Sequence, residues 1–238
     1  PGVATAATGG QDSVGLRCPA HPVAHALLVA CAAPADAAVP GDAPVWGVAA
    51  PSANRFGRVS PTTAAHVQAE LGDALLVLDG GACAVGIEST IIDCTRGVPV
   101  LLRPGAITRD QIAAACGLHP LSKEELPAHT PRASGTLLTH YAPSAKVRLM
   151  DAKALQAGLD VLGSDAAHLA VYARTSLHSA SSGVLLRRMP ADAATAATEL
   201  FAALRSFDDA GVRLIWIETP PDTPDWEGVR DRLQRAAA

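Results

Sequence analysis

The stretch VLLRRMPADAATAATELFAALRSFDDAGVRLIWIE, residues 184–218, contains one complete unit of the expected fold. Val184 to Arg188 and Leu214 to Glu218 are short apolar runs typical of strands, and Asp192 to Ala210 between them has a helical pattern. The same alternation continues on both sides, with strands at Val147–Met150 and Leu169–Tyr172 and helices at Asp151–Leu162 and Asp225–Ala236. Strands that alternate with helices indicate βαβ units and a mainly parallel sheet. We therefore predict a small Rossmann-like α/β domain over residues 147–238. It lacks a GxGxxG fingerprint, so dinucleotide binding is not expected there.

The first 118 residues have a different pattern from residues 147–238, because their strand-like runs alternate with loops rich in Gly, Pro and Ser. We expect helices at Pro22–Cys31, from Ser60-Pro61 to Leu71, and from a capping box at Thr108–Gln111 to Gly117. We expect strands at Val45–Ala50, Ala74–Leu78, Thr90–Cys94 and Val98–Leu102. Residues 119–146 carry four prolines and little periodicity, so we interpret them as a linker.

Composition narrows the class of protein. Apolar residues make up 49% of the 238-residue chain and charged residues 18%, which is typical of a globular protein. No apolar run approaches the roughly 18 residues of a membrane helix, and no secretory signal is evident. The five cysteines include no CxxC pair, which disfavours a disulfide framework or a cysteine zinc site and favours a reducing cytoplasm.

Charge argues against a dedicated nucleic-acid binder. Residues 1–130 contain 7 Lys/Arg against 11 Asp/Glu, and residues 131–238 contain 12 of each. The chain therefore lacks a basic footprint, and any RNA contact must be local or transient. The eight histidines form no HExxH or HxH pair, and no GxSxG elbow or Walker motif is present, so neither nucleophilic catalysis nor a P-loop is supported.

The segment Ala50-Pro51-Ser52-Ala53-Asn54-Arg55-Phe56-Gly57-Arg58-Val59-Ser60-Pro61 is the richest in chemistry. It lies between an expected buried strand and an expected helix start. Ligands of open α/β sheets bind beyond the carboxyl ends of strands, and a helix N-terminus favours phosphate. Its hydroxyl, amide and guanidinium donors therefore predict an anion site, with an ordinary polar loop and helix cap as the alternative.

Arginines also end two other strand-like pieces. Arg17 precedes Cys18-Pro19, and Arg103 precedes Pro104-Gly105. Glu88-Ser89-Thr90 opens a further strand with hydroxyls that could hold a ligand or only bond the local turn. An arginine at a strand end either reaches water or pairs with a carboxylate or phosphate. Their clustering in a stretch with few basic residues favours an anionic ligand.

Taken in order, six motifs resemble the YrdC-like family in its long, two-domain form. They are VGLRCPAHPVA (14–24), APSANRFGRVSPT (50–62), LDGG (78–81), GIESTIID (86–93), LLRPGAIT (101–108) and SGTLLTHYAP (134–143). The resemblance implies an incomplete YrdC-like twisted α/β sheet domain over residues 1–118, a linker with the HYAP motif over 119–146, and the Rossmann-like domain beyond. It covers residues 8 to 238, and it implies that the opening of the family domain, with its KxR basic motif, is absent.

The family forms threonylcarbamoyl-AMP and pyrophosphate from L-threonine, bicarbonate and ATP with Mg²⁺, and thus serves tRNA modification next to the anticodon. By resemblance, the ATP-contacting positions are Ser13, Ala50 (through its backbone), Ser52, Asn54, Ser60, Arg103 and Tyr141. The threonine-contacting positions are Arg17 and Ser89. No residue acts as a nucleophile and no protein ligand for the metal is identifiable.

Two alternatives stay open at this point: an RNA-binding YrdC-like module and an inactive fragment. A transient contact with tRNA or with a downstream transferase complex is also compatible with the resemblance. The stretch CAAPADAAVPGDAPVW, residues 31–46, is longer than the usual connection and is interpreted as a surface insertion. We expect this stretch of chain alone to be inactive or feeble, because the basic motif for the triphosphate is missing.

Overall fold

A four-stranded parallel sheet forms the centre of the second half of the chain. The computed structural model describes residues 5–32, 45, 47–122, 125 and 140–238. The strands are β4 (Lys146–Met150), β5 (Leu169–Ala173), β6 (Val184–Arg188) and β7 (Leu214–Glu218). Their order across the sheet is β4-β7-β5-β6, and every neighbouring pair is parallel. The predicted parallel α/β unit is therefore confirmed, with all four strands where the sequence indicated them.

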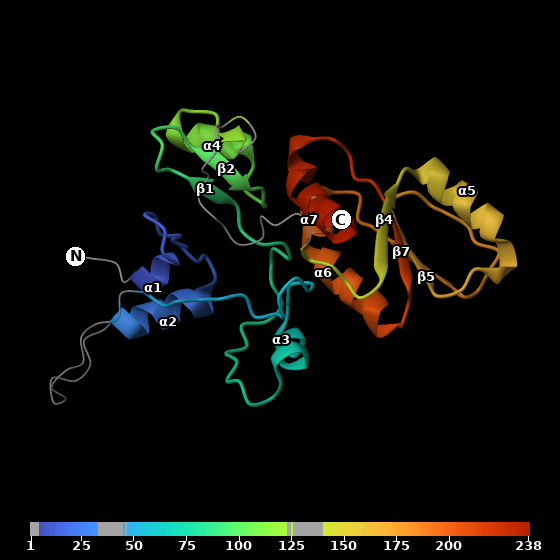
Figure 1. Ribbon diagram of the computed structural model, residues 1–238, viewed down its shortest axis with the longest axis horizontal. Helices are drawn as coiled ribbons and strands as arrows, with labels where there is room; N and C mark the ends of the chain where they lie inside the picture. Colours follow the sequence, from blue (N-terminus) through green and yellow to red (C-terminus); the bar gives the residue numbers. More distant parts are fainter. Residues whose placement is uncertain (1–4, 33–44, 46, 123–124, 126–139) are drawn as a thin grey trace.

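Helices cover both faces of this sheet (Figure 1). They are α5 (Ala152–Leu162), α6 (Ala193–Asp209) and α7 (Glu227–Ala237), with the short 3₁₀ turns η2 (Gly163–Asp165) and η3 (Pro224–Trp226). Helices α6 and α7 pack on one face and α5 on the other. Asp151 and Asp192 begin α5 and α6 as N-caps, since each carboxylate accepts a backbone N–H three residues later, at 2.7 Å and 2.8 Å.

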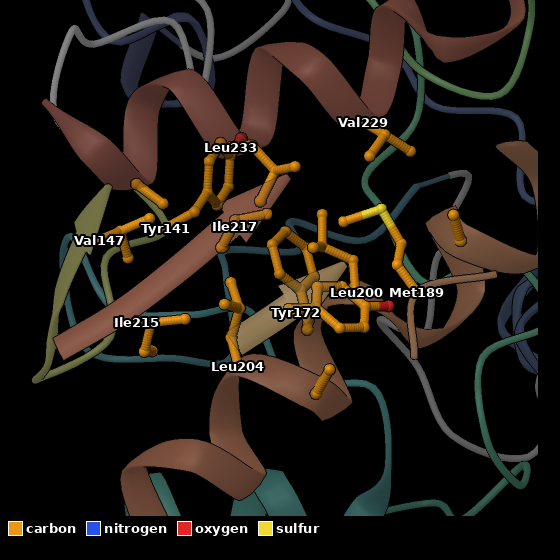
Figure 2. Packing of buried hydrophobic residues seen from close by; sticks show 14 of the residues in the cluster. Tyr141, Val147, Tyr172, Met189, Leu200, Leu204, Ile215, Ile217, Val229 and Leu233 are labelled. Atoms are coloured by element: carbon orange, nitrogen blue, oxygen red, sulfur yellow. The ribbon is translucent and has the colours of Figure 1, made fainter. Parts of the chain in front are cut away.

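Side chains of β5 alternate between two separate cores. Ala170 and Tyr172 pack with α6 and α7, whereas Leu169, Val171 and Ala173 pack with α5. All five residues of this strand are buried, as expected for a central strand covered on both faces. Figure 2 shows the larger of the two cores, where Tyr172, Leu200 and Leu204 meet Ile217 and Leu233.

The first half of the chain has a smaller, mixed sheet. Its helices are α1 (Thr5–Thr8), α2 (Pro22–Ala32), α3 (Ala64–Leu71) and α4 (Arg109–Cys116), and its strands are β1 (Ile91–Asp93), β2 (Val100–Arg103) and β3 (Leu121–Ser122). Strand β2 is central, antiparallel to β1 and parallel to β3. The α/β fold class is thus confirmed for both halves.

The local signals for α4 are confirmed in detail. Thr108 and Gln111 form a reciprocal capping box, in which each side chain bonds the other residue's backbone N–H, at 3.3 Å and 2.9 Å. Gly117 ends the helix with φ of 76°. The prediction of a helix at Pro22–Cys31 is likewise confirmed by α2.

Three predictions for the first half are wrong. Residues 47–50 and 74–78 form no strand, and Val48, Leu76 and Leu78 are exposed. A strand needs a hydrogen-bonding neighbour, and no described segment pairs with either run. Helix α3 begins at Ala64 with Thr63 as its N-cap, because the Ser60 hydroxyl is used elsewhere, on Glu88.

The structure describes only part of the predicted linker at residues 119–146. Leu121–Ser122 form β3 beside β2, and Lys146 begins β4. Residues 126–139, and most of the predicted insertion at 31–46, lie outside the described residues. The division at 118 and 146 therefore stays a prediction. Within the described ranges, no helix combines the length and apolar character needed to cross a membrane.

The larger core predicts a clear stability effect at Leu200. This α6 residue is 0% exposed, so Leu200→Ala should remove apolar contacts and leave a cavity, lowering the free energy of unfolding by about 2–5 kcal/mol. Val161→Ala on α5, where the side chain is 87% exposed, should change it by less than about 0.5 kcal/mol. Urea denaturation followed by circular dichroism measures both. Equal effects would contradict the packing described.

Candidate active site

Residues 86–90, which lead into β1, lie against the second half of the chain. A Cβ at Gly86 would meet the backbone oxygen of Thr198 at 2.2 Å, so only glycine permits this approach to α6. Ile87, next in sequence, is buried. A Cβ on Gly228 of α7 would come within 2.8 Å of the Ile87 side chain and 2.9 Å of the Gly105 carbonyl oxygen. The segment is thus held between the two halves.

Arg103 fixes Ser89. The antiparallel register of β1 and β2 places Ile91 opposite Arg103, so the start of β1 faces the end of β2. The Arg103 guanidinium donates from Nε and Nη2 to the Ser89 carbonyl oxygen at 3.0 Å and 2.9 Å, and Nη2 lies 3.5 Å from its Oγ. Arg103 is 3% exposed, and this burial lowers the pKa of its guanidinium.

The Glu88 carboxylate connects two further elements. Its Oε1 accepts a hydrogen bond from the Ser60 hydroxyl, and its Oε2 accepts one from Arg232 Nε at 2.7 Å. Ser60 comes from the loop before α3, and Arg232 comes from α7. One carboxylate therefore brings together the 50–61 loop, the start of β1 and the last helix.

The loop at 54–58 is closed by its own asparagine. The Asn54 amide donates to the carbonyls of Arg55 and Arg58 at 2.9 Å and 3.1 Å. The Ala142 N–H donates to the Gly57 carbonyl at 3.0 Å, and Arg58 forms an isolated parallel bridge with Ala142. Asn54 thus shapes the loop, and the loop is joined to the residue that follows Tyr141.

The 50–61 loop, the start of β1, the end of β2 and helix α7 meet around Glu88, and we call this meeting point the junction. Tyr141 lies at its centre. It is 1% exposed and has a φ of 61°, a left-handed conformation that non-glycine residues rarely adopt. Its ring centroid is 4.1 Å from that of His140 and 5.3 Å from the guanidinium carbon of Arg232. Burial, and then the Glu88 carboxylate, raise the pKa of Tyr141, and burial lowers the pKa of His140. The phenol and the imidazole are therefore both favoured in their neutral forms.

The structure brings together some of the predicted site residues and not others. Ser60, Ser89, Arg103 and Tyr141 gather around Glu88, and Asn54 closes the adjoining loop. Arg17, Ala50 and Ser52 are exposed and Ser13 is half-buried; among the described residues, no hydrogen bond or ion pair links these four to Glu88. Their assignment to threonine or ATP stays a prediction.

Two members of the junction were missed in the sequence. In the sequence Glu88 is part of a hydroxyl-bearing turn, and Arg232 is part of no motif. The signal for Arg232 is its spacing, because it lies three residues after Val229 and four before Ala236, on the buried stripe of α7. A charged residue on an apolar stripe needs buried partners, so this position pointed to an ionic contact.

Known proteins match the chain over nearly its whole length. Two family models apply, one described as "Threonylcarbamoyl-AMP synthase, C-terminal domain" over residues 107–238 and one described as "Telomere recombination" over residues 1–105. The chain belongs to the threonylcarbamoyl-AMP synthase family. The resemblance drawn from the six motifs is thereby confirmed.

Curated relatives carry the same name. The threonylcarbamoyl-AMP synthase of Bacillus subtilis (strain 168) is 34% identical over 241 residues, covering 97% of this chain and 64% of the relative. That of Schizosaccharomyces pombe is 31% identical over 263 residues, covering 100% and 60%. The chain therefore spans less than two thirds of the length of these relatives.

Solved structures of this family also match. The crystal structure of P. abyssi Sua5 complexed with L-threonine aligns with a TM-score of 0.79 at 30% identity, over 99% of this chain and 67% of that one. A variant of the same archaeal protein, with a histidine and the following tyrosine changed to alanine, aligns with a TM-score of 0.80 at 28% identity.

The described residues offer charge and hydroxyl groups rather than a metal cage. No three His, Cys, Asp or Glu side chains are grouped there as a metal site would require. Arg103 supplies a buried positive charge at the junction, the charge of Arg232 is balanced by Glu88 and Asp231, and Ser60 and Ser89 supply hydroxyls. Such a site can hold anionic groups and align them, without forming a covalent bond to them.

The lowered pKa of His140 predicts an acid-sensitive junction. Because the folded protein holds this imidazole neutral, the unfolded chain binds its proton more readily. The corresponding stability is present above the unfolded pKa of about 6.5 and is lost as the pH falls below it. His140→Phe keeps a ring beside Tyr141, so its free energy of unfolding should fall less between pH 7 and pH 5 than that of the unmodified chain.

Chemical denaturation at several pH values measures this slope. Some acid sensitivity should remain in the variant, because burial also lowers the pKa of His66. Parallel curves for the two proteins would contradict the account.

Proposed function

We propose that the chain provides a part of an L-threonylcarbamoyladenylate synthase, a nucleotidyltransferase. The substrates would be L-threonine, bicarbonate and ATP, and the products threonylcarbamoyl-AMP and pyrophosphate. The observation that carries the proposal is the match of 97% of the chain to a threonylcarbamoyl-AMP synthase, together with its structural likeness to a relative complexed with L-threonine.

The chemistry would join two acids through phosphorus. The threonine amine takes up bicarbonate or carbon dioxide to give a carbamate. A carbamate oxygen then attacks the α-phosphorus of ATP, the bond to the bridging oxygen breaks, and pyrophosphate leaves. This transfer needs alignment and charge neutralisation more than covalent help, which fits a junction of arginines and hydroxyls without a nucleophile.

Residue roles follow from the motifs and the geometry together. Arg17 and Ser89 would hold threonine, with Arg17 pairing its carboxylate through two parallel donors. The ATP side would be formed by Ser13, the Ala50 backbone, Ser52, Asn54, Ser60, Arg103 and Tyr141. Mg²⁺ would arrive on the phosphates of ATP, since the described residues provide no grouped ligands for it.

Tyr141 has additional support. His140-Tyr141 is the one adjacent His–Tyr pair of the sequence, and a relative has a solved structure with such a pair replaced by alanine. In this chain the Tyr141 ring lies 5.3 Å from the guanidinium carbon of Arg232, and the His140 ring packs against Tyr141. Tyr141 would close one side of the nucleotide site, where its neutral phenol adds no negative charge beside phosphate.

The product would serve threonylcarbamoylation of tRNA adenosine next to the anticodon, in the cytoplasm. The charge balance argues that contact with tRNA, or with the complex that performs the transfer, is transient. A salt-sensitive gel shift of tRNA by this chain would instead favour the RNA-binding alternative.

Reconstitution tests the activity. The chain joined to the part of the Bacillus subtilis relative that lies outside the match should release pyrophosphate only when L-threonine, bicarbonate and ATP are all present. The 238-residue chain alone should be much slower, because it spans only 64% of the length of that relative. A folded, joined protein that releases no pyrophosphate, or releases it equally without threonine, would contradict the proposal.

Ligand titration of the joined protein tests the two arginines. Arg17→Ala should weaken L-threonine about tenfold or more and ATP little, because losing a hydrogen bond to a charged group has about this effect. Arg103→Ala should weaken ATP by a similar factor and L-threonine less, the smaller loss arising because Arg103 also holds the Ser89 carbonyl. Isothermal titration with each ligand measures the difference. Equal losses for both ligands in both variants would reject the assignment.

A further inference from the structure

Helix α7 belongs to the second half of the chain, yet the side chain of Arg232 on this helix extends into the candidate site. We propose that Arg232 is a positioning residue for the threonine and nucleotide groups, acting through Glu88 and Pro104. The inference rests on the proposed function, and it gives the last helix a part in forming the site.

Arg232 is the largest side chain that is fully buried among the described residues, with 0% exposure. Its guanidinium donates four hydrogen bonds. Nε donates to Glu88 Oε2 at 2.7 Å and Nη2 to the Glu88 carbonyl at 3.0 Å; Nη1 donates to the Pro104 carbonyl at 2.7 Å and to Asp231 Oδ2 at 2.8 Å. Three of these four bonds thus reach the first half of the chain.

The acceptors are the immediate neighbours of two predicted ligand residues. Glu88 precedes Ser89, and Pro104 follows Arg103. The Glu88 carbonyl is held by Arg232 and the Ser89 carbonyl by Arg103, so two consecutive peptide groups are fixed by two guanidinium groups. With both peptides fixed, the direction of the Ser89 side chain is set from either side.

The same guanidinium also orients the Ser60 loop. Glu88 accepts from Arg232 with one carboxylate oxygen and from the Ser60 hydroxyl with the other. Rotation of the carboxylate would break one bond or the other. Arg232 therefore fixes Ser60 through Glu88, and it fixes the residue after Arg103 through the Pro104 carbonyl.

Charge compensation explains why an arginine can be buried here. Glu88 and Asp231 supply two carboxylates within 2.8 Å, and the Tyr141 ring lies 5.3 Å from the guanidinium carbon. Arg235 holds the other Asp231 oxygen, with Nε at 2.9 Å. A lysine has one nitrogen and cannot reach acceptors on both sides, so charge alone would not reproduce the arrangement.

Arg230 provides a matched control on the same helix. Its Nη1 donates to the Pro221 and Thr223 carbonyls, and its Nη2 pairs with Asp222 at 3.1 Å. All three partners of Arg230 belong to the second half of the chain. Arg230→Met therefore removes an arginine network of similar size from α7 without touching the segments at 88 and 104.

The test compares Arg232→Met, Arg232→Lys and Arg230→Met in the 238-residue chain. Hydrogen exchange followed by mass spectrometry reports on the peptides that cover residues 86–92 and 103–107. Isothermal titration with L-threonine and with ATP, in the joined protein carrying the same substitutions, reports on the site. Both Arg232 variants should accelerate exchange in the two segments and weaken L-threonine about tenfold, the effect of losing a hydrogen bond to a charged group. Arg230→Met should change either measurement less than about twofold.

The outcomes separate the inference from the proposed function. Unchanged exchange in Arg232→Met, equal effects in Arg230→Met, or full rescue of threonine affinity by Arg232→Lys would overturn the positioning role. A joined protein that binds neither L-threonine nor ATP would contradict the proposed sites, while the exchange measurement on the 238-residue chain would still decide whether Arg232 fixes the two segments. If Arg232→Met does not fold, Glu88→Gln removes the charge of the other partner of this ion pair. It should give the same faster exchange and the same weaker L-threonine binding.

Discussion

The ion pair between Arg232 and Glu88 is the contact on which the arrangement of the two halves depends. A buried guanidinium is costly unless every donor is satisfied, and here its acceptors come from the start of β1, the end of β2 and its own helix. The pair therefore requires the two halves to meet in one orientation. Close contacts at Gly86 and Gly228 have the same effect, because no side chain would fit there.

Much of the second half could be predicted from sequence because its signals are local and agree with one another. The strands of the parallel sheet are short, largely apolar runs, and two of the helices that alternate with them, α5 and α6, start at an Asp cap. In the central strand β5, burial of every residue removes the ambiguity that a half-exposed strand would have. The junction could not be found in this way, because the partners of Arg232 lie 128 and 144 positions away in the chain.

The first half shows where local reasoning fails. The runs at 47–50 and 74–78 have the composition of strands, but composition supplies no neighbour, and a strand without one is not formed. Ser60 has the sequence context of a helix cap, yet its hydroxyl bonds Glu88 and Thr63 caps α3 instead. In both cases a tertiary partner decides between two structures that the local sequence permits equally.

Order in the first half is tied to the second. Arg205 on α6 donates to the Val59 and Ser60 carbonyls and pairs with Glu70, while Arg109 on α4 pairs with Glu227 on α7. Large apolar side chains such as Leu16, Phe56 and Leu76 remain more than 80% exposed, so the first half buries only part of its apolar surface. Polar contacts with α6 and α7 consequently hold the loops that carry the candidate ligand residues. A domain that supplies these contacts shapes the site as directly as the residues that would touch the substrates.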